Sequence, residues 1–149
     1  MSQIFTREFD VIWADLDPNG HMRHTAYMDY AAKVRLAFLT EHGFTLAKFQ
    51  QARVGPILFR EETDYRREVR AGERITVGLE LIGLSANRKH WAFRQPIYKA
   101  SGELAATVTV RGAWFSLTER KVVPAPEALE AVVEKMPHAA DFAPIEKPV

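Results

Sequence analysis

The chain has 149 residues, 47% of them hydrophobic, and its 20 basic and 19 acidic residues give a formal net charge of +1. This length fits one domain with one core, and the near-neutral charge argues against nucleic acid or an anionic membrane as a partner. The absence of cysteine excludes disulfides, thiolate metal sites and a cysteine nucleophile. We therefore expect a single globular domain over residues 1–149.

No targeting or membrane-spanning signal is evident. The N-terminal sequence MSQIFTREFD lacks the apolar core of a secretory signal peptide. No run approaches the ~20 consecutive apolar residues that a membrane-spanning helix requires. We therefore expect a soluble, cytoplasmic protein with no membrane partner.

The first half of the chain predicts a strand and then a long helix. Alternation of Phe9, Val11 and Trp13 with polar or oppositely facing residues predicts a half-buried strand over residues 5–13. The polar run DLDPNGHMRH follows at residues 15–24. Residues 25–43 then change to a 3.6-residue period, with Gly43 placed to end the helix. Because this helix is apolar around most of its circumference, we expect it to be largely enclosed.

The second half predicts mainly strands. Residues 44–56 show no clear period and are expected to be irregular, whereas period-two patterns predict strands over residues 57–69, 75–81, 90–100 and 104–117. Pro96 favours a sheet edge or a bulge in the third of these strands. Residues 126–136 predict a short closing helix. Meandering strands after one long helix indicate an α+β domain, with an antiparallel sheet and the helix packed on one face.

The polar run could hold a metal ion. Asp15, Asp17, Asn19 and Gly20 match the first half of a calcium-binding loop, D-x-[DN]-x-[DN]-G. That loop needs a bidentate glutamate at its twelfth position, where this chain has Ala26, and it needs a preceding helix rather than a strand. A calcium site is therefore excluded.

A transition-metal site and a plain turn are the other simple interpretations. Asp17, His21 and His24 are ligand types that suit zinc or iron, but no other histidine lies at a paired spacing. The sequence Asp-Pro-Asn-Gly by itself predicts a turn between strand and helix. The turn explains the polarity but not the two histidines beside it, and we expect no bound metal.

Acyl transfer is the chemistry that this stretch suits best. A carboxylate just before a helix lies close to backbone N–H groups of the first helical turn, which have no partner inside the helix. Asp17 is then a candidate general base or nucleophile, and amides near His24 and Thr25 are candidate donors to a carbonyl oxygen that gains negative charge. His24 is a candidate to orient water, to bond the carbonyl or to steady Asp17.

The pattern D-x-D-x-x-G-H-x-x-x-x-x-Y, followed by a long helix and four strands, resembles the hotdog-fold acyl-CoA thioesterases of the 4-hydroxybenzoyl-CoA thioesterase type. The resemblance covers nearly the whole chain. It implies a hotdog fold, in which an antiparallel sheet wraps around one long central helix. It also implies an acyl-CoA substrate, no cofactor, and a homodimer or homotetramer with active sites at the dimer interface.

The resemblance assigns roles residue by residue. Asp17 matches the family's catalytic aspartate, and Gly20 and His21 match its Gly-His turn. His24 matches a functional histidine of the Tol-Pal-associated short-chain subgroup. Tyr27 matches the helix tyrosine, although a helical tyrosine is more often a core residue.

Other positions carry weaker expectations. Arg88 and Lys89 lie where the family contacts the nucleotide of CoA, although an exposed turn explains them equally well. We expect Asp15 to be structural and assign no catalytic role to Trp13, where the same subgroup has tyrosine. The aromatic residues of the later strands, Trp91, Phe93 and Trp114, are expected in the core or at a subunit contact.

The sequence therefore predicts a hydrolase that cleaves the thioester of an acyl-CoA. Two alternatives stay open: a hotdog enoyl-CoA hydratase or dehydratase, and a non-catalytic acyl-CoA-binding protein. The preferred acyl group and the choice between nucleophile and general base for Asp17 also stay open. Residues 44–60 and the face of the long helix are expected to shape the acyl pocket.

Overall fold

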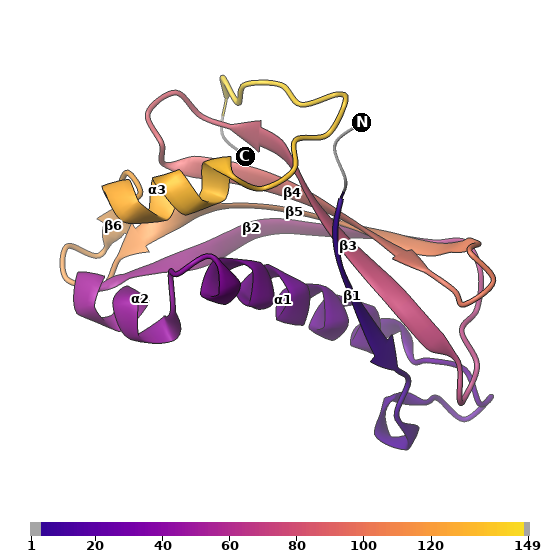
Figure 1. Cartoon of the computed structure of the whole chain (residues 1–149). Coiled ribbons are helices and arrows are strands. Elements are labelled where there is room, and N and C mark those ends of the chain that lie inside the picture. The colour runs from indigo at the N-terminus through magenta and orange to yellow at the C-terminus, as the bar shows by residue number, and fades with distance from the viewer. Residues whose placement is uncertain (1–3, 148–149) are drawn as a thin grey trace.

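The computed structural model describes residues 4–147, and this part of the chain forms one six-stranded antiparallel sheet with helices packed against it (Figure 1). The strands are β1 (Phe5–Asp10), β2 (Val54–Tyr65), β3 (Arg74–Leu84), β4 (His90–Tyr98), β5 (Leu104–Ser116) and β6 (Lys121–Val122). The helices are the 3-10 helix η1 (Trp13–Asp15), α1 (His24–Glu41), α2 (Leu46–Ala52) and α3 (Glu127–Glu134). The strand order is β1-β3-β4-β5-β2, and β6 pairs with β5.

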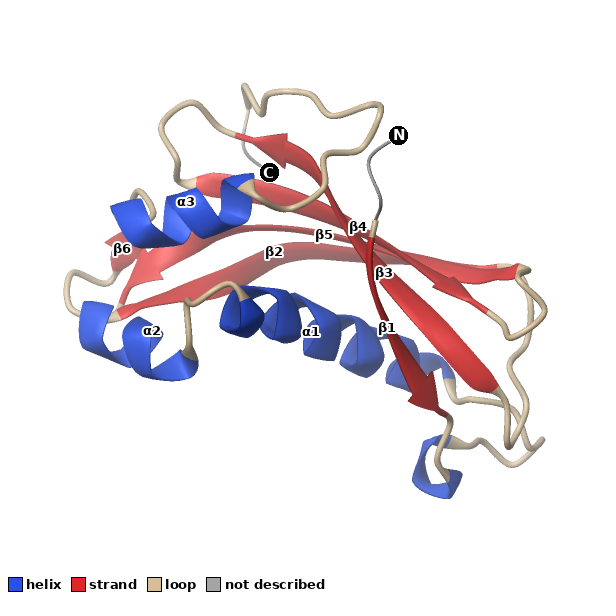
Figure 2. Cartoon of the chain, viewed as in Figure 1, coloured by secondary structure: helices blue, strands red, loops and turns tan. Residues whose placement is uncertain are grey.

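The sheet curls, and the long helix α1 runs along its hollow side (Figure 2). Alternate residues of β3 point to this side and are fully buried: Ile75, Val77, Leu79 and Leu81. α1 contacts β1, β3 and β5. The expected α+β hotdog arrangement, a sheet wrapped around one long helix, is confirmed.

One face of α1 remains open, so the expected enclosure is only partly right. Tyr27, Tyr30, Val34 and Phe38 are buried as the 3.6-residue period predicts. Leu36, by contrast, is 50% exposed on the side toward α2 and the start of β2. A single copy of the chain therefore leaves part of its apolar helix uncovered.

The first strand is shorter than predicted. β1 ends at Asp10, which pairs with Arg74, the first residue of β3, so the ladder has no further residue to pair with. Trp13 lies instead in η1, and its side chain is 88% exposed. The predicted burial of Trp13 is therefore wrong.

Residues 44–56 are not irregular. Thr45 caps α2, since its hydroxyl oxygen accepts a hydrogen bond from the Lys48 amide at 3.3 Å, and Arg53 ends the helix in the left-handed region at φ 56°. β2 then begins at Val54 and ends at Tyr65, so residues 66–69 leave the sheet earlier than predicted.

The strand order also differs from a simple meander. Consecutive hairpins join β3, β4 and β5, but β1 occupies the free side of β3, and β2 pairs with β5 at the far edge. β4 is an internal strand, so Pro96 does not mark an edge. The β4–β5 register shifts between Ile97 and Tyr98, next to Pro96, as the bulge alternative predicted.

A buried carboxyl group on α3 opposes ionisation. Glu130 is 7% exposed, and its Oε2 has no hydrogen-bond partner within residues 4–147. Burial, with repulsion from Glu134, raises the pKa of Glu130, and Arg88 partly offsets the rise. The folded state therefore holds this proton more tightly than the unfolded chain, and the stability contributed by Glu130 falls as the pH rises through the folded-state pKa.

We expect Glu130→Gln to raise the melting temperature by a few degrees at about pH 8, because the variant no longer buries an ionised carboxylate. The difference from the parent protein should shrink as the pH is lowered, because the parent's carboxyl group then becomes protonated. Thermal unfolding followed by circular dichroism measures both. Glu127→Gln, at an exposed position of the same helix, serves as the control and should give no increase. A lower melting temperature for Glu130→Gln at about pH 8 would contradict this account.

None of the helices within residues 4–147 combines the length and the apolar character needed to span a bilayer.

Candidate functional site

The Asp17 carboxylate is held by the turn it belongs to. Its Oδ1 accepts hydrogen bonds from the amides of Asn19 at 2.9 Å and His21 at 3.1 Å. Gly20 makes the turn possible, because its φ of +78° lies in the left-handed region that side chains disfavour. Asp17 Oδ2 accepts no hydrogen bond from residues 4–147. The turn interpretation of Asp17 is therefore right, and it leaves one carboxylate oxygen free for chemistry.

Asp15 anchors the loop to the long helix. Its Oδ2 accepts a hydrogen bond from the Tyr30 hydroxyl at 2.6 Å, and its Oδ1 accepts one from the Arg23 guanidinium at 3.1 Å. Burial and this hydrogen bond raise the pKa of Tyr30 to about 12. Asp15 is therefore structural, as expected, and it fixes where the loop carries Asp17.

Replacing Tyr30 with Phe is expected to destabilise the fold by about 1.5–3 kcal/mol, the usual scale for a hydrogen bond to a charged group. The loop should also lose its fixed position, so activity should fall together with stability. Chemical denaturation and a turnover assay measure the two effects. Tyr98→Phe is the matched control, because the Tyr98 hydroxyl makes no hydrogen bond within the described residues. A Tyr30→Phe protein as stable as the parent would show that this anchor is dispensable.

The start of α1 offers unpaired amides. The helix begins at His24 after Arg23, and no side chain caps it. Within the described residues, the amides of His24 and Thr25 have no hydrogen-bond partner, and geometry prevents any partner inside the helix. The Thr25 hydroxyl oxygen accepts a hydrogen bond from Arg23. These amides are available to an anion or a polarised carbonyl.

Asp17 and the helix start border one open cavity of about 360 Å³. Its lining residues come from the loop, from α1 and from the segment after β2: Asp17, His21, Met22, His24, Tyr27, Tyr65, Arg66, Arg67 and Glu68. The Tyr65 hydroxyl donates a hydrogen bond to the His24 carbonyl at 3.1 Å, which joins the end of β2 to the start of the helix.

Two further residues line this cavity: Tyr27 from α1 and His21 from the preceding loop. The Tyr27 ring is buried and meets the Tyr65 ring edge-on, with 5.2 Å between centroids. Burial raises the pKa of Tyr27, and Tyr65 and Asp17 add to the rise, so its hydroxyl stays protonated near neutral pH. His21 Nε2 lies 3.4 Å from the Glu68 carboxylate. Tyr27 is thus both a core residue and a lining residue.

Arg88 and Lys89 lie far from this cavity within one chain. The turn at Ala71, next to the start of β3, donates a hydrogen bond to Gly20, whereas Arg88 and Lys89 follow the other end of β3. The 11 residues of β3 span roughly 35 Å at about 3.3 Å each. A role for Arg88 and Lys89 at the Asp17 cavity therefore requires a second copy of the chain.

Sequence reasoning missed the basic segment beside Asp17. Arg66 and Arg67 line the cavity because the chain leaves the sheet after Tyr65. The continuing alternation of YRREV concealed this departure.

Within residues 4–147, no group of three or more histidine, aspartate or glutamate side chains could hold a metal ion.

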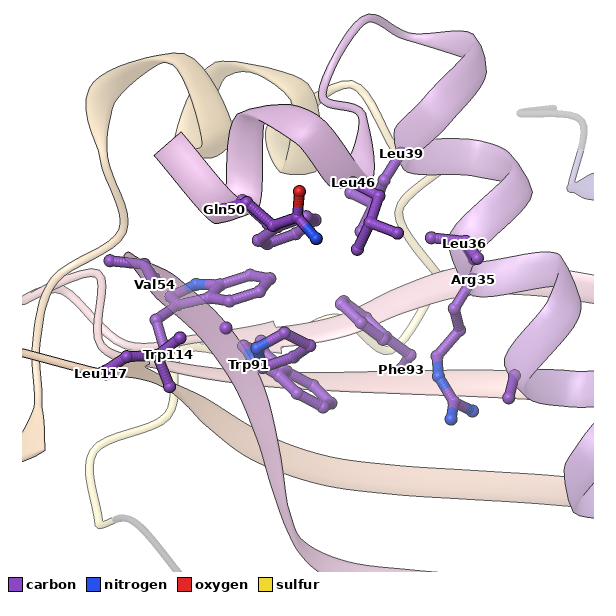
Figure 3. Close-up of a pocket in the computed structure, with 14 residues that line it drawn as sticks. Arg35, Leu36, Leu39, Leu46, Gln50, Val54, Trp91, Phe93, Trp114 and Leu117 are labelled. Carbon is purple, nitrogen blue, oxygen red and sulfur yellow. The ribbon is translucent and has the colours of Figure 1, made fainter. Parts of the chain in front are cut away.

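A second, apolar cavity of about 410 Å³ lies between the C-terminal half of α1, α2, the start of β2 and the aromatic residues of β4 and β5 (Figure 3). Trp91, Phe93 and Trp114 form its floor and belong to the buried core. Gly112 has to be glycine, because a Cβ there would lie 2.6 Å from the Trp91 ring. The three aromatic residues are in the core, as expected, and they also line this cavity.

The model of one protein family, the thioesterase-like superfamily, matches residues 11–133, which include the Asp17 loop, both helices that border the apolar cavity and strands β2 to β6. The chain belongs to the thioesterase-like superfamily. The resemblance to hotdog-fold thioesterases noted in the sequence is thereby confirmed.

Solved structures share the fold of this thioesterase-like chain at low sequence identity. A Staphylococcus aureus protein solved in complex with CoA is 23% identical, with a TM-score of 0.83, over 94% of this chain and 90% of that one. A 1,4-dihydroxy-2-naphthoyl-CoA thioesterase from Synechocystis is 21% identical, with a TM-score of 0.80, over 92% of this chain and 100% of that one. A comparison with curated protein sequences gave no match.

The two cavities of this thioesterase-like chain lie at opposite ends of the same elements. The Asp17 cavity adjoins the start of α1 and the end of β2, at Tyr65. The apolar cavity adjoins Leu36 of α1 and Val54 at the start of β2. Along the helix, Leu36 lies about 18 Å from His24 at about 1.5 Å per residue. The chain therefore carries a polar cavity and an apolar cavity that are separated from each other.

Proposed function

We propose that the protein is an acyl-CoA thioesterase in which Asp17 is the general base or the nucleophile. The observation that carries the proposal is the free Oδ2 of Asp17 in the same cavity as the start of α1, where the amides of His24 and Thr25 lack partners. A carboxylate beside unpaired amide donors is the pair of groups that thioester hydrolysis needs.

The proposed chemistry follows from these groups. As a general base, Asp17 takes a proton from water while the water oxygen bonds to the thioester carbon. Negative charge then moves to the carbonyl oxygen, which the two amides stabilise by hydrogen bonds. The carbon–sulfur bond breaks on collapse, and the CoA sulfur takes up the proton. As a nucleophile, Asp17 would itself bond to the carbon and release CoA, and water would then hydrolyse the acyl anhydride.

The proposal includes a homodimer formed through the free edge of β2. β2 pairs with β5 alone in residues 4–147, so its other edge offers unpaired backbone groups. Exposed apolar side chains gather along this edge and the mouth of the apolar cavity: Leu36 (50%), Leu46 (62%), Leu58 (43%), Phe59 (44%) and Leu117 (42%). A second copy of the chain would pair with the backbone groups of this strand edge and would cover the apolar patch.

Such a dimer would join the two kinds of cavity as halves of one site. Antiparallel pairing of β2 with its two-fold copy sets the Tyr65 end of one strand beside the Val54 end of the other. Asp17 of one protomer then faces the apolar cavity of the other, which would receive the acyl group. The same arrangement moves Arg88 and Lys89 of the partner copy toward the first protomer's Asp17, where we propose that they contact CoA phosphates.

The substrate class has support from relatives. One structure of the same fold was solved with CoA, and another is a 1,4-dihydroxy-2-naphthoyl-CoA thioesterase. A cavity of about 410 Å³ lies within the usual range of about 300–1,000 Å³ for small-ligand sites. An acyl-CoA substrate also agrees with the cytoplasmic location expected from the sequence.

Release of free CoA thiol from a panel of acyl-CoA esters tests the proposed activity. We expect turnover for at least one fatty or aromatic ester. Hydration of an enoyl-CoA without thiol release would identify the hydratase alternative. Tight ester binding with neither reaction would identify a non-catalytic acyl-CoA-binding protein. Either result would overturn the thioesterase proposal.

A further inference from the structure

One cationic side chain lines the apolar cavity. Arg35 extends from α1 toward the strands beside Phe93 (Figure 3), and it is half-buried. Its Nη1 donates a hydrogen bond to Oε1 of Gln95 at 2.8 Å. Gln95 is fully buried, and its Nε2 donates a hydrogen bond to the Ala31 carbonyl at 2.8 Å. This bond orients the Gln95 side chain so that its Oε1 faces Arg35.

Arg35 lacks the carboxylate partner that Arg7 and Arg94 have. Arg7 pairs with Glu41, and Arg94 pairs with both Glu80 and Asp141. Within residues 4–147, Arg35 forms no ion pair, and the neutral oxygen of Gln95 is its hydrogen-bond acceptor. The carboxylate that most affects Arg35 is that of Glu61, an exposed residue of β2.

Placing the Arg35 guanidinium among the apolar walls of this cavity costs free energy. Burial lowers the pKa of Arg35, which reports the penalty of removing a charge from water, and Glu61 offsets it in part. A guanidinium has five N–H donors, and one of them is used by Gln95. An apolar side chain could fill the same space without this cost, because removing a charge from water without a counterion is unfavourable. Packing alone therefore does not account for an arginine at this position.

We propose that Arg35 selects acyl groups that carry an oxygen acceptor away from the thioester, with a carboxylate preferred to a neutral oxygen. This inference rests on the proposed thioesterase function, because it takes the apolar cavity as the acyl site. Apolar walls hold the body of the acyl group, and the remaining guanidinium donors bind its oxygen. A charge-assisted hydrogen bond of this kind is stronger than a neutral one and is strongest in a two-pronged geometry.

Matched ester pairs test the inference. The kcat/KM values of octanedioyl-CoA and octanoyl-CoA are compared, and those of hexanedioyl-CoA and hexanoyl-CoA, for the parent protein, Arg35→Met, Arg35→Lys and Arg74→Met. We expect the parent to favour the dicarboxylic ester in at least one pair. Arg35→Met should lower the ratio within that pair at least about tenfold, since about 1.4 kcal/mol is lost with one such contact. Arg35→Lys should keep part of the preference.

The control and the contrary outcomes are distinct. Arg74 is an exposed arginine at the start of β3 that borders none of the cavities, so Arg74→Met should keep the parent's ratio. A parent that favours the monocarboxylic ester in both pairs, or an Arg35→Met variant that slows both esters of a pair equally, would overturn the inference while leaving the thioesterase activity intact.

Failure of the proposed function would look different. If no ester releases CoA, calorimetric binding of the same ester pairs to the parent and to Arg35→Met still measures the selection. A preference for the dicarboxylic ester that Arg35→Met removes would support the inference in a binding protein. Equal affinities would contradict it. If Arg35→Met does not fold, the parent's own preference and the Arg35→Lys variant still decide.

Discussion

Replacing Asp17 with Asn is expected to lower kcat at least about a hundredfold, the usual scale for a lost general base. The substitution is structurally conservative, because the amide oxygen of asparagine can still accept the hydrogen bonds that Asp17 Oδ1 receives from Asn19 and His21. What it removes is the negative charge and basicity of Oδ2. We therefore expect a normal melting temperature and little change in KM. The turnover is measured by the reaction of released CoA with a thiol reagent.

Asp10→Asn is a suitable control for this variant. Asp10 is an exposed carboxylate at the end of β1 that pairs with Arg74 and borders neither cavity. Its replacement should leave turnover close to that of the parent. A near-native rate in Asp17→Asn would remove Asp17 from the chemistry. Equal losses in both variants would point to an unspecific charge effect.

Introducing a charge into the β2 edge is expected to prevent formation of the proposed dimer and to abolish most of the activity. Leu58 is 43% exposed on β2 and lies outside the lining of the apolar cavity. Burying an aspartate at Leu58 against a second copy would cost several kcal/mol, so Leu58→Asp should be monomeric. We expect its turnover to fall about a hundredfold or more, because each site would lack the half supplied by the partner.

Light scattering coupled to gel filtration measures the state of Leu58→Asp, and circular dichroism verifies its fold. Leu58→Ala is the matched control, because it shortens the same side chain without adding a charge and should remain dimeric and active. A folded, monomeric Leu58→Asp protein with full activity would show that one chain contains the whole site.

Mixed dimers distinguish a shared site from a damaged one. Asp17→Asn supplies intact Arg88 and Lys89, and the double variant Arg88→Ala/Lys89→Ala supplies intact Asp17. Both variants should lose most of their kcat/KM, the first through the chemistry and the second through CoA binding. If each site combines both halves, unfolding and refolding the two proteins together should restore roughly a quarter of the parent kcat/KM. Half of the dimers are then mixed, and each mixed dimer has one complete site. No recovery would contradict the shared site.

The sequence predicted the Asp17 loop because its signals are local. Asp-Pro-Asn-Gly specifies a turn through backbone geometry, and the 3.6-residue period begins directly after it, so the carboxylate and the helix start had to be neighbours. The same local reasoning failed at Trp13, since the end of β1 depends on where β3 begins. Arg74, the partner of Asp10, lies more than sixty residues further along the chain.

Features that depend on several distant elements were not predictable from one sequence. Arg66 and Arg67 reach the Asp17 cavity because β2 ends at Tyr65, although the alternating pattern continues beyond it. β2 likewise pairs with β5 and not with β3, the next strand along the chain, which pairs with β1 and β4. These outcomes are competitions between pairings of similar local quality, which tertiary packing decides.

The most direct test is a crystal structure of Asp17→Asn with an intact acyl-CoA ester bound. The account predicts the thioester carbon within about 3–3.5 Å of the residue 17 side chain, the usual separation of reacting atoms. The carbonyl oxygen should receive hydrogen bonds from the amides of His24 and Thr25, and the acyl group should enter the apolar cavity of the second protomer. An ester bound with its carbonyl remote from residue 17 would contradict the account.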